Sequence, residues 1–439
     1  MDSASSPQND IIEKMSKGRL IILIVGLILI VGLILLFVLG GRRTSQELSG
    51  NLTLWGVDSE FVMASMITKY EQVRPNVKIT YRLFNAATYE QDLVNALAAG
   101  RGPDLFMVHN SWLPKHYDKL LAINPSQLSI GTFRQLYPTV VEQNFAPDGI
   151  IFALPLYLDT LATIYNKELF DAAAIATPPK TWSELQTLIP KLRKVDKSGR
   201  LTQAAAAIGS SNRTISRGTD LLNALFLQSG TPMVDQDFSQ TTFYPDGLGS
   251  LEFYTNFANP NNPSYTWNDN LGYSVDSFAE GNTAIIFNYA SALAVVREKN
   301  PFINFGIAPL LQPQNAQQPV NWADYWGLGV SVKSRQAAAA WDFISFLTAS
   351  PTASKDYLTT TGRPPALRSL ITQYQTDPTL AVFAKQALTA RSWPQIDNIA
   401  VASSFSKAID AVVSGRASAD KALLQTSEEL NDLMARRAR

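Results

Sequence analysis

Apolar positions along this chain follow two alternating spacings from residue 51 onward. Residues 52–57 (LTLWGV) form a mostly apolar run of strand length, and residues 77–84 (VKITYRLF) alternate apolar and polar side chains with the period of two expected of a strand. Residues 59–73 and 88–100 instead carry apolar side chains at helical spacing. Strands that alternate with helices in this way predict a parallel sheet covered by helices, an α/β fold.

The stretch GRGPDLFMVHNSW, residues 100–112, indicates a turn, a buried strand and a polar, aromatic tip. Glycine and proline end the preceding helix, and LFMV is a short apolar run that suits a strand. The polar and aromatic residues 109–112 follow at the end of that strand. In open α/β sheets, ligands bind beyond the C-terminal ends of the strands. We therefore expect residues 109–112, together with residues 55–58, to lie at a ligand-binding edge.

Further elements are predicted toward the C-terminus. Thr181 and Glu184 form a capping box at the start of an amphipathic helix. Most of the chain after residue 350 is predicted to be helical, up to Met434. The other expected elements are a helix over 219–230, a strand and a helix within 276–298, strands over 303–311 and 325–332, and a helix over 334–350.

The N-terminal region is predicted to hold the chain at a membrane. Residues 20–39 are Leu, Ile, Val, Phe and Gly without any charge, and a helix of that length spans about 30 Å, the thickness of the hydrocarbon layer. The run ends in Gly-Gly-Arg-Arg without a small-residue cleavage pattern, which favours an uncleaved anchor over a cleaved signal peptide. We expect a cytoplasmic tail over 1–19, a transmembrane anchor over 20–40, a tether over 41–49, and the globular part outside the cell.

Composition excludes several classes of function. The chain has 439 residues, which suits about two domains, and its 37 basic and 37 acidic side chains give a formal net charge of zero. A general nucleic-acid-binding protein would carry a basic excess. There is no cysteine and there are only two histidines, which excludes disulfides and a lipid-bearing cysteine and argues against a metal site. No G-x-S-x-G, H-E-x-x-H or G-x-x-x-x-G-K motif occurs, so we expect no catalytic residues and no cofactor.

Ten stretches spread over roughly residues 50–435 carry a family resemblance. They are LTLWGVDSE, YEQVRPNVKITY, LAAGRGPDLFMV, FALPLYLDTLATIYNKELF, PPKTWSELQTLIPKL, FLQSGTPMV, SFAEGNTAIIFNYAS, INFGIAPL, AAWDFISFL and TGRPPA. Each alone is a common pattern, but in this order they resemble the family 1 extracellular solute-binding proteins of ABC importers, the maltose-binding-protein-like group. Many relatives are soluble or anchored through a lipid-bearing cysteine, whereas here the predicted transmembrane segment would provide the tether.

The resemblance implies a type II periplasmic-binding-protein fold, with two α/β lobes and a ligand cleft between them. One lobe would contain residues 50–157 and 303–350, and the other residues 158–302 and 351–439. The implied partners are a small-molecule solute and the transmembrane subunits of an ABC permease. We expect no nucleic-acid partner and, because no heptad pattern indicates self-association, a monomer.

Ligand-binding candidates follow from what a sugar offers. A sugar presents hydroxyl groups and apolar C–H faces, so its site needs flat aromatic rings and polar groups such as Asp, Asn and Arg. Asp159, counted back from IYNK, holds a position where maltose-binding relatives have a ligand-contacting glutamate. The candidate set is Trp55, Asp58, Asn110, Trp112, Asp159, Asn288, Tyr289, Trp326, Arg363 and Trp393. Secondary candidates are Trp267, Trp322, Asp324 and Asp397.

Structural roles stay open for several of these residues. Asp159 could cap a turn at the hinge, Asp58 could be the N-cap of the helix that follows it, and Arg363 could be a solvated loop charge. His109 is expected to be a partly buried hydrogen-bonding residue, and Trp341 is expected to pack in the interior of an amphipathic helix.

The predicted function is capture of an extracellular sugar or oligosaccharide by closure of the two lobes, for delivery to a permease. Three alternatives stay open: a sensor or adhesin on the same scaffold, a surface hydrolase that would use Asp58 and Asp159 as its carboxylate pair, and a binder of glycerol phosphate or another small solute. A phosphate would need several cationic side chains at the cleft, and the sequence clearly offers only Arg363.

Overall fold

The computed structural model describes residues 48–437. The predicted cytoplasmic tail and transmembrane anchor, and most of the tether, lie outside these residues. Within residues 48–437 we find no helix with the length and apolarity that a bilayer crossing requires.

The larger sheet combines strands from residues 50–155 with one strand from residues 326–331. Its order is β2–β1–β3–β13–β4, and β5 also pairs with β13. β1 is parallel to β2 and β3, whereas β13 is antiparallel to β3, β4 and β5. The strands are β1 (Gly50–Gly56), β2 (Val77–Leu83), β3 (Leu105–His109), β4 (Leu120–Leu121), β5 (Ala153–Pro155) and β13 (Trp326–Ser331).

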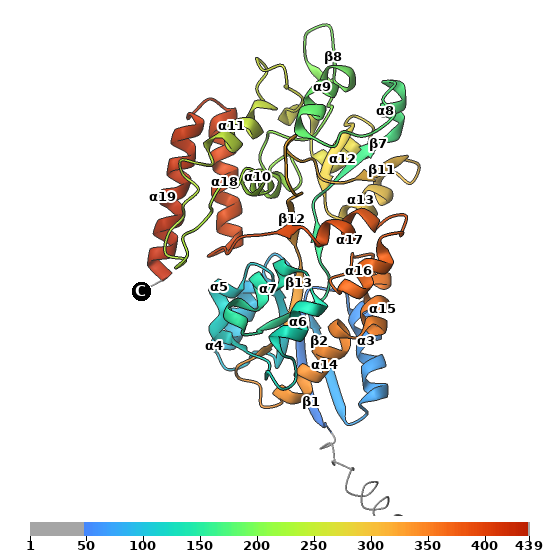
Figure 1. Cartoon of the computed structure of the whole chain (residues 1–439), viewed down its shortest axis with the longest axis vertical. Coiled ribbons are helices and arrows are strands. Elements are labelled where there is room, and N and C mark those ends of the chain that lie inside the picture. Colours follow the sequence, from blue (N-terminus) through green and yellow to red (C-terminus); the bar gives the residue numbers. More distant parts are fainter. Residues whose placement is uncertain (1–47, 438–439) are drawn as a thin grey trace, which may run out of the picture. The chain divides into compact units, whose positions relative to one another are not determined.

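Helices cover this sheet and complete the first lobe, in the lower half of Figure 1. α3 packs against β2, α14 packs against β13 and β1, and α15 packs against both helices. The helices of this lobe are α3 (Glu60–Val73), α4 (Tyr89–Ala98), α5 (Leu113–His116), α6 (Ile130–Leu136), α7 (Thr139–Phe145), α14 (Ala337–Ala349) and α15 (Pro351–Thr361), with the 3-10 turns Tyr117–Lys119 and Pro147–Gly149.

The second lobe, in the upper half of Figure 1, contains a smaller sheet of order β10–β7–β11 and most of the remaining helices. Its strands are β7 (Ala162–Asn166), β10 (Ile285–Asn288) and β11 (Phe305–Ala308), with a separate hairpin of β8 (Lys194–Val195) and β9 (Leu201–Gln203). The helices are α8 (Lys167–Ala172), α9 (Trp182–Leu192), α10 (Gly218–Gln228), α11 (Leu248–Asn256), α12 (Ser274–Ala279), α13 (Ser291–Lys299), α18 (Asn398–Val413) and α19 (Ala419–Arg437), with the 3-10 turn Asp269–Leu271.

A short three-stranded sheet joins the two lobes, and we call it the crossing sheet. It has the order β14–β12–β6 and contains β6 (Asp159–Thr160), β12 (Asn321–Asp324) and β14 (Ala390–Arg391). The chain passes through it three times: from β5 to β7, from β11 to β13, and from the first lobe toward α18. On the last passage, α16 (Arg368–Tyr374) contacts α6 and α15, and α17 (Ala381–Ala387) contacts β6 and β12.

The sheets differ from the expected all-parallel arrangement. In the larger sheet β1 is parallel to β2 and β3, and in the crossing sheet β12 is parallel to β14, whereas β7 is antiparallel to both of its neighbours. The reason is the repeated crossing between lobes. β3 and β5 run toward the crossing sheet, whereas β13 runs away from it, so these strands pair in opposite directions.

Two expected lobe boundaries also differ from the structure. Residues 303–311 were assigned to the first lobe, but β11 pairs with β7 along four residues of the second-lobe sheet. The return to the first lobe therefore follows β11. Similarly, the second lobe was expected to resume at residue 351, but α15 packs on α3 and α14, so this change of lobe comes later.

Local signals in the sequence determine where the helices begin. The Ser59 hydroxyl accepts a hydrogen bond from the Val62 N–H, as expected of an N-cap at α3. Thr181 accepts from the Glu184 N–H, and the Glu184 carboxylate reaches back to the Lys180 N–H, which confirms a capping arrangement at α9. Trp341 is buried in α14, as predicted.

The buried amide of Gln386 on α17 ties the crossing region together. Its amide nitrogen donates to the Thr160 hydroxyl and to the Leu161 carbonyl, both at 2.9 Å. Its amide oxygen accepts from the Leu310 N–H at 2.6 Å. One side chain therefore satisfies backbone groups from two different passages of the chain, which fixes these passages relative to each other.

Replacing this amide should destabilise the chain. In Gln386→Leu, the Leu310 N–H and the Leu161 carbonyl would be buried without partners, so we expect the free energy of unfolding to fall by at least about 2 kcal/mol. Urea unfolding measures this loss. Gln373→Leu, at an exposed position on α16, is the matched control and should change stability by less than about 0.5 kcal/mol. Equal stability of the two variants would contradict the role given to Gln386.

Candidate functional site

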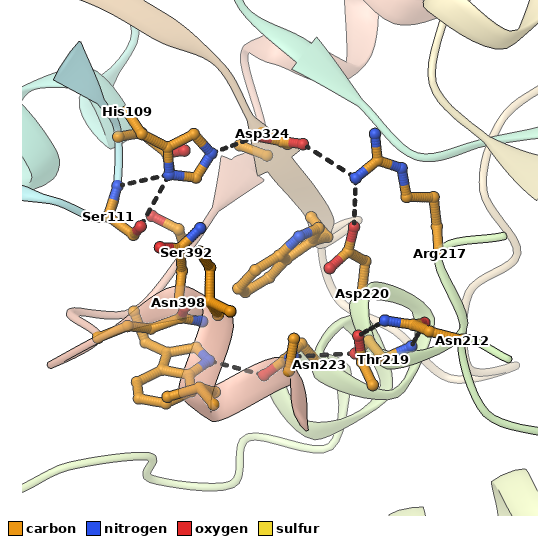
Figure 2. Close-up of a pocket in the computed structure, with 18 of the residues that line it drawn as sticks. His109, Ser111, Asn212, Arg217, Thr219, Asp220, Asn223, Asp324, Ser392 and Asn398 are labelled. Atoms are coloured by element: carbon orange, nitrogen blue, oxygen red, sulfur yellow. Dashed lines mark hydrogen bonds and ion pairs between the residues drawn. The ribbon is translucent and has the colours of Figure 1, made fainter. Parts of the chain in front are cut away.

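A cavity of about 440 Å³ lies where the crossing sheet meets both lobes. The ends of β3 and β13 contribute from the first lobe, β12 from the crossing sheet, and the start of α10 with residues 392–402 from the second lobe. Figure 2 shows side chains from these elements pointing toward one another. The lining residues are Ala86, His109, Asn110, Ser111, Asn212, Arg217, Thr219, Asp220, Asn223, Trp322, Ala323, Asp324, Trp326, Ser392, Trp393, Gln395, Asn398, Ile399, Val401 and Ala402.

Three tryptophans from different elements give the cavity aromatic walls. Trp326 at the start of β13 packs edge-on against His109, with ring centroids 5.2 Å apart, and against Trp112 at 5.1 Å. Trp322 belongs to β12, and Trp393 donates from its indole nitrogen to the Asn223 side chain at 2.7 Å. Such walls can cover the apolar face of a ligand while polar groups contact its edges.

A chain of charged and polar groups follows one wall of the cavity (Figure 2). His109 Nε2 lies 2.6 Å from Asp324 Oδ1, and its Nδ1 lies 2.8 Å from the Ser111 hydroxyl. Arg217 Nη1 lies 3.8 Å from both Asp324 Oδ2 and Asp220 Oδ2. His109 belongs to the first lobe and Arg217 to the second, so Asp324 on the crossing strand connects the two.

The two carboxyl groups in this chain have pKa values shifted in opposite directions. Burial alone would raise the pKa of Asp324, but the hydrogen bond from His109 and the nearby positive charges outweigh it and lower the pKa. For Asp220, burial is the largest influence and raises the pKa to about 6, although Arg217 opposes the shift. Asp324 is therefore the stable anion of the pair.

Two lining residues have unusual local features, Arg217 in its backbone and Asn398 in its side chain. Arg217 precedes α10 with a φ of 66°, the left-handed conformation that non-glycine residues rarely adopt. Asn398 begins α18, and its Oδ1 is buried without a hydrogen-bond partner among the described residues. A buried acceptor without a partner is costly, which sets Asn398 apart from its neighbours in the lining.

Three of the ten residues predicted from the sequence line the cavity: Asn110, Trp326 and Trp393. Asn110 also has a structural role, because its side-chain oxygen accepts from the Tyr325 N–H and its backbone N–H donates to the Tyr325 carbonyl. His109, expected to be a hydrogen-bonding residue, has that role and lines the cavity as well. The secondary candidates Trp322 and Asp324 also line it.

Four more of the predicted residues lie directly behind the lining. Trp112 is buried against Trp326, and the Tyr289 hydroxyl donates to Asp220 at 2.9 Å. Asn288 donates to the Ser216 hydroxyl, next to Arg217. These side chains orient the residues that line the cavity. Asp159, the fourth, is 3% exposed and its Oδ1 accepts from the Thr160 and Ala290 N–H groups.

The remaining three predicted residues lie elsewhere in the first lobe. Asp58 is buried and forms an ion pair with Arg363, with Oδ1 and Nη1 2.8 Å apart, so Arg363 is not a solvated loop charge. The Arg363 guanidinium also stacks over the Tyr157 ring at 4.2 Å. Trp55 borders a separate hollow under Arg82. Strand ends alone therefore did not distinguish side chains that enter the cavity from those that turn away.

Sequence reasoning missed the second-lobe side of the cavity. No candidate was drawn from the segment 210–220 (SSNRTISRGTD), which precedes and begins the predicted helix 219–230, yet it contributes Asn212, Arg217, Thr219 and Asp220. A usable signal was present, because this polar run directly precedes a helix that is buried over most of its length. Asn398 was also missed. It is the first residue of α18, and its neighbour Asp397, the N-cap of that helix, was named as a secondary candidate instead.

Solved structures show that this is the two-lobed α/β fold of the periplasmic binding proteins. The sugar-binding protein MalE of Xanthomonas citri matches with a TM-score of 0.73 at 20% identity, over 89% of this chain and 98% of that chain. A solute-binding protein of Thermotoga lettingae, bound to α-D-tagatose, matches with a TM-score of 0.69 at 23% identity, over 88% of this chain and 100% of that chain.

The family follows from the sequence. The model of the bacterial extracellular solute-binding proteins matches residues 57–353, and the chain belongs to this family, as its sequence pattern predicted. The maltotriose-binding protein of Pyrococcus abyssi is 24% identical over 392 residues, which cover 87% of this chain and 82% of that protein. The mannitol-binding protein of Pseudomonas aeruginosa is 23% identical over 296 residues, which cover 64% of each chain.

Asp159 has a pKa that predicts how stability depends on pH. Burial is the largest cause and raises this pKa from 3.8 to about 7 in the folded chain. Between these values the folded chain holds a proton that the unfolded chain has lost, so ionisation favours unfolding. The free energy of unfolding should therefore fall by about 4 kcal/mol, from this residue alone, as pH rises from about 4 to above 7.

Asp159→Asn tests this prediction. The amide oxygen can still accept from Thr160 and Ala290 but cannot ionise, so the variant should gain stability relative to the native chain as pH rises. Urea unfolding at several pH values from about 4.5 to 7.5 measures the difference. Asp237→Asn, at an exposed carboxyl, should track the native chain. Parallel curves for the native chain and Asp159→Asn would show that Asp159 does not take up a proton in this range.

Proposed function

We propose that this chain captures a neutral sugar between its two lobes as the solute-binding component of an ABC importer. The observation that carries the proposal is the lining of the cavity, which combines three tryptophans with neutral polar side chains from both lobes. The unpartnered Asn398 oxygen supports a ligand that offers hydroxyl groups. The maltotriose-binding and mannitol-binding relatives carry ligands of that chemistry in their names.

The charges in the cavity favour a neutral ligand over a phosphate. Asp220 and Asp324 contribute two carboxyl groups, and Arg217 is the one guanidinium or ammonium group among the lining residues. Arg363, the candidate that the sequence offered for a phosphate, is occupied by Asp58. A phosphate would therefore meet more negative than positive charge, whereas a sugar hydroxyl can donate to the carboxylates and accept from Arg217.

The positions of Asp58 and Asp159 also favour capture of a solute over hydrolysis of a glycoside. A glycoside hydrolase needs two carboxyl groups that flank the same bond of the substrate. Neither Asp58 nor Asp159 lines the cavity, because the first pairs with Arg363 and the second accepts backbone hydrogen bonds. We therefore propose that the chain is not an enzyme and returns its ligand unchanged.

The apolar run over residues 20–39 supports a further part of the proposal. We infer that it anchors the chain in the cell membrane as a single pass, with the lobes outside. The tether over 41–49 would then keep a monomeric binding unit close to the permease. This inference rests on the length and the uncharged character of the run.

A thermal-shift screen tests the ligand class. The full-length chain, purified in a mild detergent, is heated with mono- and oligosaccharides, polyols, glycerol phosphates, amino acids and short peptides. A ligand present at a hundred times its Kd stabilises the folded chain by about 2.7 kcal/mol, which shifts Tm by a few degrees. We expect a shift from neutral saccharides or polyols, with the compound recovered unchanged. A shift from glycerol phosphate alone, or consumption of a saccharide, would overturn the proposal.

Asn398→Ala should weaken binding without lowering stability. The variant loses one hydrogen-bond acceptor for the ligand, so Kd for a saccharide that shifts Tm should rise about five- to ten-fold. Calorimetric titration measures Kd, and the Tm without ligand should stay within about one degree, because Ala suits a helix start at least as well as Asn does. Asn270→Ala, at an exposed position in the 3-10 turn Asp269–Leu271, is the matched control. An unchanged Kd would place the ligand away from Asn398.

A further inference from the structure

Lys115 joins the two lobes beside the cavity. It lies on α5, three residues after the segment 109–112 at the end of β3. Its ammonium nitrogen lies 2.7 Å from Glu90 Oε1, on α4 of the same lobe, and 2.5 Å from Asp397 Oδ2, at the start of α18 in the other lobe. Asp397 directly precedes the lining residue Asn398, so this ion pair spans the two lobes at the edge of the cavity.

The two carboxylates that contact Lys115, those of Asp397 and Glu90, are also fixed by other partners. Asp397 is the N-cap of α18, and its Oδ1 accepts from the Ile399 and Ala400 N–H groups at 3.1 and 3.0 Å, which leaves Oδ2 for Lys115. Glu90 Oε1 also contacts His116 Nε2 at 2.8 Å. Because the acceptors are fixed, the ion pair requires little further ordering of its partners.

The bridge is more shielded than an ordinary surface ion pair. The side chains of Lys115, Glu90 and Asp397 are 28%, 12% and 24% exposed, respectively. Burial opposes the charge on Glu90, but hydrogen bonds from His116 and Lys115 outweigh it and lower the pKa of Glu90 to about 2. Partial burial reduces screening by solvent and salt, so such a pair contributes more than an exposed one.

We propose that Lys115 is a positioning residue that sets ligand affinity by stabilising the closed lobes, although it does not touch the ligand. The contact with Glu90 lies within one lobe and persists when the lobes separate, whereas the contact with Asp397 exists only when they are close. An interaction present in one of two states shifts the equilibrium toward that state. This inference rests on the proposed function, because it assumes that the lobes close around a bound solute.

Substitutions at both ends of the pair can separate this role from folding. Lys115→Met keeps the aliphatic length and removes the charge. Asp397→Asn keeps an oxygen that can cap α18 and removes the charge that attracts Lys115. Lys115→Arg restores the charge and serves as the rescue. Lys119→Met is the matched control, because within residues 48–437 the ammonium group of Lys119 forms an ion pair only with its neighbour Asp118.

Lobe separation is measured by fluorescence transfer in the full-length chain. Because the native chain has no cysteine, Ala64→Cys on α3 and Lys191→Cys on α9 provide two exposed labelling sites, one in each lobe. Maltotriose is the probe ligand, and its Kd and dissociation rate are measured on the same variants. We expect Lys115→Met and Asp397→Asn to lie further open than the native chain and to bind maltotriose on the order of ten-fold more weakly, through faster dissociation. Lys115→Arg and Lys119→Met should match the native chain.

The outcomes distinguish the two proposals. If lobe separation in Lys115→Met and Asp397→Asn equals that of the native chain, with and without maltotriose, the role of Lys115 is overturned. If both variants open but neither maltotriose nor any other saccharide changes the Tm or the lobe separation of the native chain, the role of Lys115 stands and the sugar proposal fails. A change of Tm in the variants without a change of lobe separation would make the pair merely structural, which also overturns the proposal.

Discussion

The carboxylate of Asp324 lies where the crossing strand meets both lobes, and the cavity is arranged around it. His109 approaches it from the end of β3 and Arg217 from the start of α10. Burial alone would favour the neutral form of this carboxyl group, so its negative charge depends on these two partners. Two residues from opposite lobes are thereby positioned by one charge. Asp220 is positioned in turn, since Arg217 lies between the two carboxyl groups.

Buried hydrogen bonds run through the connection between the lobes, and they give it one defined geometry. Gln386 satisfies groups at Thr160, Leu161 and Leu310, and Asp159 accepts from the N–H groups of its neighbour Thr160 and of Ala290 at the start of α13. Apolar packing tolerates many small displacements, whereas a buried hydrogen bond that is lost without replacement is costly. In the closure that we propose, the lobes would separate by bending around the crossing sheet while its hydrogen bonds remain intact. Contacts farther from this sheet, such as Lys115 with Asp397, are then the ones that change.

Much of the fold was predictable because it depends on local patterns. Apolar periodicity located β1, β2 and β3 with α3 and α4, and the Thr181 cap marked a helix start that the structure confirms. Strand direction and the lobe boundaries depend instead on how the chain crosses between lobes, which is a property of distant pairing such as that of β11 with β7.

The residues of the site were harder to predict from the sequence than the fold. Asp58 and Arg363 satisfy each other in the interior, and a sequence does not show that two charges 305 positions apart are partners rather than ligand contacts.

The closure that we propose around a ligand would depend on two kinds of contact that the structure keeps separate. Inside the cavity, Asn398 has an acceptor without a partner, and Arg217 lies 3.8 Å from each of its carboxylates, beyond an ordinary hydrogen bond. A hydroxyl group placed between these side chains would gain hydrogen bonds that neither lobe can provide alone. At the edge, Lys115 and Asp397 already satisfy each other without a ligand. A ligand can shift the equilibrium between open and closed lobes only by the difference in its affinity for these two states. Any free energy that the contact between Lys115 and Asp397 contributes to the closed state therefore reduces the affinity difference that closure requires of the ligand. Affinity and selectivity can then vary independently, because the residues that recognise the solute are not the ones that hold the lobes together.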